Sequence, residues 1–558
     1  MSATPELARR MRVLADRERV LDALQLGARE LAERCAGADW SEESVVADSV
    51  VAALVLERLA EESGAWRETA AVLQRAMPFS AQVPHELRAQ LELVLARSSV
   101  RTGRIGPARQ WVDQHGTIRD WQVIGPFANE RGGGFDVAYP PEEGIDLAAS
   151  VPGKERAVAW RAQPCPESPL GVIVLDEILR PNDQAVAYLA TAVRVDSVRD
   201  ACLWLGTSGE VKVWHGTRLA LARKVQRSYH RDQDRVVLAL QPGWNPILVK
   251  LGHEEDGAWA ASARLTGLDG APLRDIEIDA RKAGEALAST VEPSGTPLRS
   301  TREILEARGE DASALRMLAE WHMVVHPDDF AERTAKKLAE RALALASEDV
   351  DTLYLVARAN EPAPGENAAE IRHNERVMPL KRVVELEPAH AGAWLDLADF
   401  WSALNPLPYS AEQAARKAVA AAPQSPRALM ALSRANDELG REAEARAYAE
   451  QARASGVGKM DSRLIVAEAS ALLAKGDRRG AISLLEGAIT NGRCDRGVVS
   501  LLCSLHLEGG NLVGLLDVHE GWMVRSPFDV SCLLETAEAF ERAGELARAR
   551  EQLEREQR

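Results

Sequence analysis

The chain has 558 residues, of which 46% are hydrophobic and 27% charged, a composition typical of a soluble protein with several globular domains. Its 84 acidic residues outnumber the 68 basic ones and give a net charge of −16. No nucleic-acid partner is expected, because nucleic-acid-binding proteins concentrate positive charge. Aromatic residues make up only 5% of the chain, yet 13 of them are tryptophan.

The N-terminus runs straight into a charged amphipathic segment, without a basic start followed by an apolar stretch, so it carries no readable secretory signal. No apolar run is long enough to span a bilayer, and we expect a cytoplasmic protein with no membrane span. The six cysteines are scattered and form no Cys-x-x-Cys pair, which argues against a metal knuckle, a redox motif or a disulfide framework.

Residues 1–116 are predicted to be helical throughout, because their apolar residues recur at helical spacing between glycines. Gly64 is followed by Ala70, and Gly103 by Ala108, a spacing that suggests helix–turn–helix units. The segment therefore looks like divergent repeats of the same kind as those over residues 303–558, described below.

From residue 117 to 278 the pattern changes to short segments rich in strand-forming residues, among them Val172–Leu175, Ala201–Leu205 and Ile247–Leu251. Glycine- and proline-rich turns separate these segments. Many short strands with such turns favour a β-sandwich over alternating strands and helices. A linker is expected over residues 279–302.

Helices return over residues 303–558, where an internal repeat is the strongest signal in the chain. The turn glycines Gly440, Gly476, Gly510 and Gly544 are spaced by 36, 34 and 34 residues. A period near 34, with small residues where two helices cross, resembles the tetratricopeptide repeat. Such helix pairs stack into a solenoid with a concave groove, since one pair alone leaves its apolar face exposed.

The β-rich segment carries three landmarks in order: Trp121–Phe127, Gly209–Gly216 and Pro242–Lys250. This order resembles the galactose-binding-like jelly rolls of many glycoside hydrolases. The opening WQVIGPF resembles still more closely the jelly roll beside tetratricopeptide repeats in large bacterial proteins, some of which continue into a transglutaminase-like domain. The resemblance implies a multidomain α and β protein, in which an α-helical solenoid flanks a jelly-roll β-sandwich.

The jelly-roll resemblance also suggests a carbohydrate site, because flat indole rings stack on sugar faces. The Arg-rich stretch after residue 217 can receive an anionic glycan or an acidic loop of a partner. If Val211 and Val213 face the core, Trp214 points outward; if His215 takes the place of the family's asparagine, Trp214 turns inward. Both registers remain open. Two further alternatives also remain open: each tryptophan packs in the protein core, and the arginines form an ordinary solvated surface. The candidate ligand residues are Trp214, His215, Arg227, Tyr229 and Trp259.

Motifs for catalysis and metal binding are missing from the sequence. His322 and His326 stand four residues apart, but they lack the glutamate of zinc proteases and a third ligand. No Gly-x-Ser-x-Gly nucleophile motif is present, and no helix start follows Gly132–Gly134. The cysteines after residue 490 fall inside the repeats, which leaves no transglutaminase-like Cys/His/Asp set. We expect no enzyme, no metal and no other cofactor.

The preferred function is a non-catalytic protein–protein interaction scaffold that binds a protein or peptide in its repeat groove. In each repeat, the first helix of the pair is expected to face the groove. Candidate groove-facing residues on these first helices include Asp399, Met430, Arg434 and Ser470, and they lack the repeated Lys–Asn pairing of chaperone-binding repeats. A groove of mixed apolar and charged residues favours a helical or extended segment. Two alternatives remain: a carbohydrate-binding module on a repeat scaffold, or the front part of a longer transglutaminase-like enzyme, since residues 551–558 still read as helix without a capping repeat.

Overall fold

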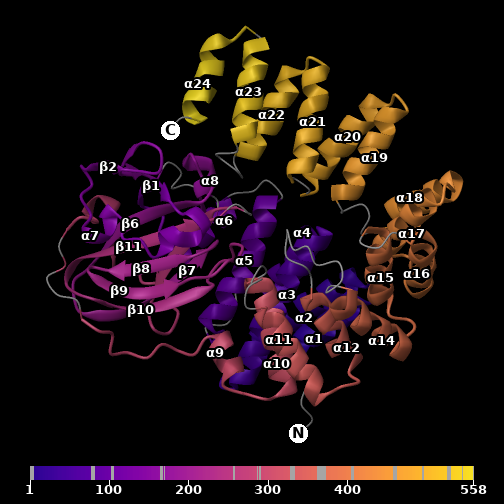
Figure 1. Ribbon diagram of the computed structural model, residues 1–558, viewed down its shortest axis with the longest axis horizontal. Helices are drawn as coiled ribbons and strands as arrows, with labels where there is room; N and C mark the ends of the chain where they lie inside the picture. The colour runs from indigo at the N-terminus through magenta and orange to yellow at the C-terminus, as the bar shows by residue number, and fades with distance from the viewer. Residues whose placement is uncertain are drawn as a thin grey trace. The chain divides into compact units, whose positions relative to one another are not determined.

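The computed structural model describes residues 6–76, 82–101, 106–163, 168, 170–254, 258–285, 287, 291–326, 333–360, 373–403, 407–455, 462–492, 495–523, 530–542 and 544–556. The chain forms two compact units, whose helices and strands are labelled in Figure 1. Unit 1 comprises Met1–Gly103, Arg299–Val324 and Arg333–Asn511, and unit 2 comprises Arg104–Leu298, Val325–Glu332 and Leu512–Arg558. Together they give the expected class, a helical solenoid alongside a β-sheet region.

Unit 1 begins with helices that pack around the apolar helix α3. Most positions of α3 are buried, because it contacts α1 and α2 as well as α5 and α9. Gly64 ends α3 in the left-handed conformation, with φ 74°, which glycine adopts at little cost. The helices are α1 (Leu7–Asp16), α2 (Val20–Gly37), α3 (Glu43–Ser63), α4 (Trp66–Leu73), η1 (Gln74–Ala76), α5 (His85–Arg101) and α9 (Thr301–Glu306).

The rest of unit 1 consists of further helices, which from α15 onward form consecutive pairs. Helix α15 packs on α16, α17 on α18 and α19 on α20; the first helices α15 and α17 contact each other, as do α19 and α21. The helices are α10 (Ala312–Val325), α11 (Thr334–Leu345), α12 (Val350–Ala359), η4 (His373–Val377), α14 (Met378–Leu386), α15 (Ala391–Ala403), α16 (Pro408–Ala421), α17 (Pro426–Glu438), α18 (Glu442–Ala454), α19 (Ser462–Ala474), α20 (Arg478–Thr490) and α21 (Arg496–Glu508).

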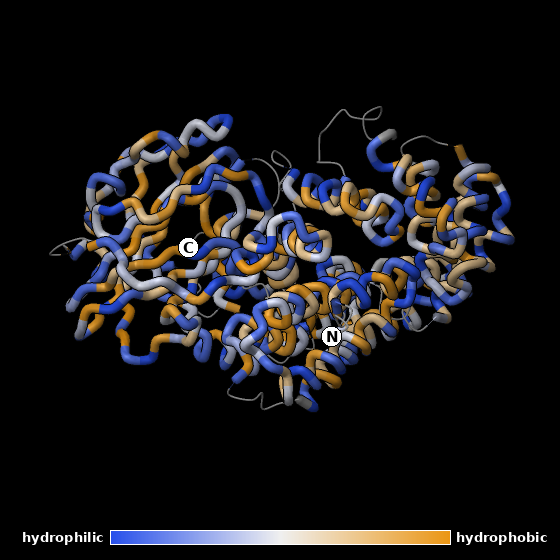
Figure 2. Tube along the Cα trace, turned by 90° about the horizontal axis from the view of Figure 1, so that it is seen from below, coloured by the Kyte–Doolittle hydropathy of each residue, from blue (hydrophilic) through white to orange (hydrophobic). Residues whose placement is uncertain are grey.

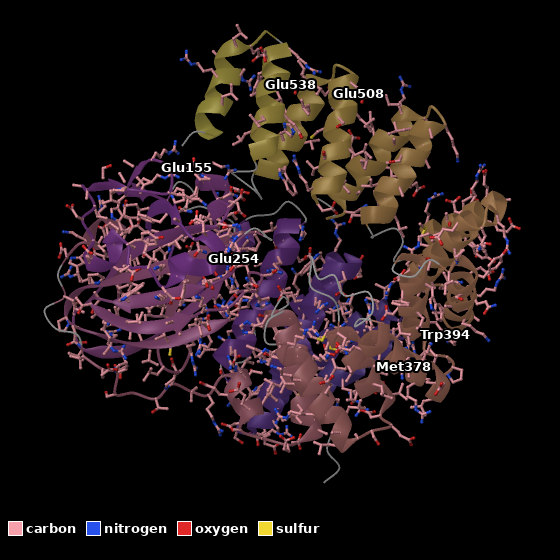
Figure 3. All side chains as sticks on the ribbon, in the orientation of Figure 1. Glu155, Glu254, Met378, Trp394, Glu508 and Glu538 are labelled. Atoms are coloured by element: carbon pink, nitrogen blue, oxygen red, sulfur yellow. The ribbon has the colours of Figure 1, made fainter. Side chains whose placement is uncertain are left out.

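The predicted repeat turns and packing residues occur where expected. Gly440 and Gly476 have φ 73° and 81°, so each supplies a turn that other residues adopt with strain. Alanines of α16, such as Ala415 and Ala418, are buried and let neighbouring helices approach closely. Trp394, labelled in Figure 3, lies on α15 and packs against the same apolar cluster.

Unit 2 contains two antiparallel sheets that pack face to face around a shared apolar core. The larger sheet has the order β4 (Arg161–Ala162), β1 (Gln122–Ala128), β6 (Ala185–Val195), β11 (Gly243–His253), β8 (Val211–His215) and β9 (Arg218–Arg223), with β13 (Glu277–Ile278) paired to β6. The smaller sheet has the order β10 (Asp234–Leu240), β7 (Arg199–Thr207), β12 (Ala260–Thr266) and β5 (Ile173–Val174). A separate hairpin joins β2 (Ser150–Pro152) to β3 (Ala157–Ala159).

A second apolar cluster lies on the outer face of the larger sheet, where Phe127 and Tyr188 pack with residues from the β2–β3 hairpin. The remaining elements of unit 2 are α6 (Gly106–Gln114), η2 (Glu130–Phe135), α7 (Pro140–Glu143), α8 (Leu175–Ile178), η3 (Ala280–Lys282), α22 (Leu512–Met523), α23 (Val530–Arg542) and α24 (Leu546–Glu556). Hydrophobic and hydrophilic stretches alternate along the chain in Figure 2. Within the described residues, every helix is too short or too polar to cross a membrane.

Candidate functional site

The structure places Trp214 on the outer face of the larger sheet. Val211 and Val213, its neighbours on β8, are fully buried in the core between the sheets, so Trp214 points the other way. This is the first of the two registers left open by the sequence. The indole is partly buried against the outer apolar cluster, and Lys212 lies on the same face.

His215 and Trp259 are both fully buried. The Nε2 atom of His215 lies 3.1 Å from Oδ1 of Asn245, and burial lowers the pKa of the imidazole although that hydrogen bond raises it. The ring of Trp259 stacks on His253, with centroids 5.3 Å apart and an angle of 9° between the planes. Neither side chain therefore presents a face to a glycan in this structure.

Arg227 and Tyr229 are engaged inside unit 2. The buried guanidinium of Arg227 forms an ion pair with Asp234 and donates a hydrogen bond of 2.9 Å to Oγ1 of Thr207. The hydroxyl of Tyr229 donates to Oγ of Ser262 at 2.8 Å. These contacts explain both residues as parts of the β-region itself, and glycan binding stays a prediction.

The predicted groove residues lie on three first helices of the repeats. Asp399 on α15 and Arg434 on α17 form an ion pair that joins neighbouring helices, and Arg427 also lies 3.6 Å from Asp399. Met430 is partly buried on α17. Ser470 is exposed on α19, and its hydroxyl donates to the backbone oxygen of its own helix at Val466. The structure therefore brings Asp399 and Arg434 together.

A charged cavity within unit 1 was not predicted from the sequence. It has a volume of about 450 Å³ and is formed by α1, α3, α12, η4, α15 and α17, together with Glu18 and the first residue of α2, Val20. Most of its walls are ionisable. The lining residues are Arg12, Ala15, Asp16, Glu18, Val20, Arg58, Leu59, Glu62, Ser63, Tyr354, Arg358, Arg376, Asp396, Pro426 and Arg427.

Most carboxylates of the cavity walls have partners. Arg427 donates to Asp396 at 2.7 Å and to Glu18 at 3.3 Å, and the hydroxyl of Tyr354 donates to the other oxygen of Asp396 at 2.8 Å. Arg58 donates to Glu62 at 2.7 Å. These bonds join helices from the two ends of unit 1 around the cavity.

Behind the wall, Glu320 on α10 accepts from two arginines that line the cavity. Nε of Arg12 donates to one carboxylate oxygen at 3.2 Å, and Arg358 donates to the other. Burial alone would raise the pKa of Glu320, but the charges of Arg358 and Arg12 outweigh burial and lower the pKa to about 2. Glu320 is therefore fully ionised at neutral pH.

Asp16 differs from the other carboxylates. Its nearest cationic atom among the described residues is Nε of Arg358 at 3.8 Å, beyond hydrogen-bond distance. Burial raises the pKa of Asp16 to about 6, although Arg358 and Arg12 act against that rise. This carboxyl group therefore changes its charge close to physiological pH.

Three arginines of the cavity have incomplete hydrogen bonding. Nη2 of Arg12, Nε of Arg358 and Nε of Arg376 are buried without a hydrogen-bond partner within the described part of the chain. A buried donor without a partner costs about 1–3 kcal/mol. Because these atoms have almost no accessible surface, their unmet hydrogen bonds belong to the packed wall and not to the open space.

No sequence motif marks this cavity. Arg12 and Glu320 are separated by 308 positions, and Arg427 and Glu18 by 409. The one local hint is the run of basic residues in the first helix, which reads as an ordinary solvated face. A charged helix surface becomes a buried wall only when a distant helix covers it.

No family model matches the chain, and no curated protein matches it. Similar solved structures include MamA, 19% identical over 27% of this chain and 76% of that chain, with a TM-score of 0.23. They also include TTC0263, a thermophilic TPR protein of Thermus thermophilus, 19% identical over 35% of this chain and 100% of that chain, with a TM-score of 0.28. A human IFIT1 dimer with PPP-AAAA is 16% identical over 46% of this chain and 56% of that chain, with a TM-score of 0.31. The helical region of this chain is tetratricopeptide-like in its own helix pairs and turns.

Proposed function

We propose that the protein is a non-catalytic interaction scaffold that binds a segment of a partner protein along the first helices α15, α17 and α19. The Asp399–Arg434 pair supports this proposal most directly. It joins two neighbouring first helices and leaves 43% of the Asp399 side chain and 51% of the Arg434 side chain exposed. A partner can replace either half of such an exposed pair at little cost, because surface ion pairs contribute only about 0–1 kcal/mol.

The side chains of the same surface favour one chemistry in the partner. Arg434 and Arg427 offer guanidinium groups beside Asp399, while Met430 supplies an apolar contact one turn from Arg434. A segment with an acidic residue next to an apolar one matches this arrangement. Helical and extended segments both satisfy it, since each can place two side chains on one face.

The test is peptide display against the full chain, followed by affinity measurement for the enriched peptides. Replacing Arg434→Glu is expected to weaken binding at least tenfold, which corresponds to about 1.4 kcal/mol. The matched control is Arg446→Glu on the second helix α18, where Arg446 is 78% exposed and pairs only with Glu442 within the described residues. Failure to enrich any peptide, or equal losses in both variants, would contradict the scaffold proposal.

A carbohydrate-binding role is the second proposal, and one observation favours it. Trp214 is incompletely buried on the outer face of the larger sheet, beside Lys212, so part of its indole is open to a ligand. A glycan array with the full chain is expected to give binding that Trp214→Ala abolishes while the strands stay intact. Retained glycan binding in Trp214→Ala, or no binding to any glycan, refutes it.

A further inference from the structure

The larger sheet of unit 2 ends in an open strand. β9 pairs with β8 along one side and is the last strand in the order of that sheet (Figure 1). Alternate backbone groups of an antiparallel strand point toward and away from its partner, so about half of the N–H and C=O groups of Arg218–Arg223 point away from β8. No other segment of the described chain forms a backbone hydrogen bond with these residues. β9 therefore leaves a row of backbone donors and acceptors for a further strand.

The other strands that end the two sheets differ from β9. β4 and β5 have two residues each, which is too short to align a further strand. All residues of β10 are buried or half-buried, and its Arg235 donates to the backbone oxygen of Leu298 at 2.7 Å. β9 has six residues, of which Leu219, Ala222 and Arg223 are exposed. Among the described end strands of these sheets, β9 therefore combines length with exposure.

The two faces of β9 differ in chemistry. Leu219 stands opposite Trp214 and shares the outer face of the sheet with it. Arg218 and Arg223 stand opposite residues of β8 whose side chains are buried on the core side. Both arginines therefore lie along the rim of the sandwich on one face, at the two ends of an apolar stretch. The strand itself contains no acidic residue.

A β-bulge sets the spacing of the two arginines. The register with β8 shifts within the strand, where β9 contains Ala220 as an extra residue. Arg218 and Arg223 are five positions apart, yet the residues opposite them, His215 and Val211, are four apart and share a face. A regular strand with carboxylates at positions i and i+4 therefore matches both arginines.

Both arginines have partners that a ligand can replace or share. Arg218 pairs with Glu292, whose side chain is largely exposed. The side chain of Arg223 is 55% exposed and lies 3.5 Å from Asp234, a carboxylate that already accepts from the buried Arg227. Exposed ion pairs contribute only about 0–1 kcal/mol. A carboxylate from a partner therefore meets little competition at either end of β9.

We propose that the open edge of β9 binds an extended segment of another protein by strand addition, and that this segment has an apolar centre between acidic residues at i and i+4. Backbone hydrogen bonds supply affinity in this mode of recognition, and the two arginines select the acidic segment. This surface belongs to unit 2 and does not depend on the scaffold or the carbohydrate proposal.

A second copy of the chain is excluded as the occupant by charge. Antiparallel pairing of the two apolar stretches places Arg218 of one copy opposite Arg223 of the other, and like charges in opposing strands destabilise the pair. Charged ends of this kind protect an edge strand from its own copies and leave it open to a strand of complementary charge.

The direct test uses the full chain and the synthetic peptide Ser-Asp-Val-Thr-Val-Asp-Ser, with lysines in place of both aspartates as the control peptide. Fluorescence anisotropy is expected to show binding of the aspartate peptide below about 1 mM and at least tenfold weaker binding of the lysine peptide. Hydrogen exchange of the full chain is expected to slow in the fragment that contains β9 when the aspartate peptide is added.

A charge swap tests the arginines. Arg223→Glu is expected to weaken the aspartate peptide at least tenfold and to strengthen the lysine peptide. The matched control is Arg194→Glu, because the side chain of Arg194 is 51% exposed on β6, an inner strand of the same sheet. This control is expected to leave both affinities unchanged. A purely structural role of Arg223 would not reverse the preference between the two peptides.

N-methylated aspartate peptides test strand addition without any change in the protein. Methyl groups on alternate amides block one of the two rows of backbone donors, so one set of methyl groups is expected to abolish binding and the other set to leave it. The proposal is overturned if the aspartate peptide does not bind at about 1 mM, or if the lysine peptide binds as tightly. It is also overturned if Arg223→Glu keeps the original preference, if the two methylated peptides bind alike, or if exchange slows only outside β9.

Discussion

Asp16→Asn gives the sharpest test of the charged cavity, because the unmodified carboxyl group is held in an unfavourable environment. The usual pKa of an aspartate is 3.8, and burial, opposed by Arg358 and Arg12, raises it to about 6 in the folded chain. A shift of about two units corresponds to about 3 kcal/mol. That is the free energy by which ionised Asp16 disfavours the folded state at neutral pH relative to acid.

The direction of the effect with pH follows from the raised pKa. The folded chain binds the Asp16 proton more tightly than the unfolded chain, so this contribution is fully present below pH 3.8 and is lost as pH rises through about 6. Asparagine is neutral at every pH. The variant is therefore expected to be more stable than the unmodified chain at pH 7.5, by up to about 3 kcal/mol, and equal to it near pH 4.

Hydrogen exchange of peptides from α1 (Leu7–Asp16) suits this measurement, since a chain of two units need not unfold in a single step. Asp16→Asn should slow exchange in α1 at pH 7.5 after correction for the intrinsic rate. The control is Asp22→Asn, because Asp22 is an exposed residue of α2 that pairs with Arg19. Faster exchange in Asp16→Asn at pH 7.5, or the same change at pH 4 and 7.5, would refute the assignment of Asp16 as a destabilised carboxylate.

Two further predictions concern the helices around the cavity and the repeats. Glu320→Gln is expected to destabilise unit 1 by about 3 kcal/mol at pH 7, because the pKa of Glu320 is about 2 in the folded chain instead of 4.5. The loss of stability is present above pH 4.5 and disappears as the pH falls through about 2. Hydrogen exchange of peptides from α10, measured at increasing denaturant concentration, checks this prediction. Gly440→Ala is expected to lower the free energy of unfolding by about 1 kcal/mol, since φ is 73° at this position. Gly487→Ala is expected to raise it by up to about 1 kcal/mol, because Gly487 lies within α20 and a new Cβ meets nothing within 4 Å. Thermal scans of the two variants check the opposite signs, and a loss at both positions would count against this account of the turns.

The fold was predictable where a local pattern determines it. The glycine spacing predicts the repeat turns, and Gly440, Gly476, Gly510 and Gly544 all have positive φ. The change from helical to alternating periodicity predicts a region of short strands after residue 117, and the strands of unit 2 lie between Gln122 and Ile278. In both cases the conformation depends on a residue and its immediate neighbours in the sequence, so it can be predicted from the sequence.

The candidate residues of the β-region show where such reasoning stops. The alternation along β8 favours an outward Trp214, but an alternative alignment of His215 was equally consistent with the sequence. Which tryptophan is buried depends on what covers it, and Trp259 is covered by His253 and the strand core. The sequence predicts Arg227 to be a cation on the surface, whereas in the structure it is buried in an ion pair with Asp234. Burial of a polar side chain is decided by partners that strand periodicity does not specify.

The charged cavity could not be predicted from the sequence for the same reason, and its buried ions have a cost in stability. Arg12 and Glu320 are buried ions, and such pairs are often no more stable than apolar residues of the same volume. A 450 Å³ space among them leaves apolar contacts unmade, and the packed wall contains unsatisfied donors, both of which cost stability. Larger apolar side chains in place of Arg376 and Asp16 would fill the space and remove these costs.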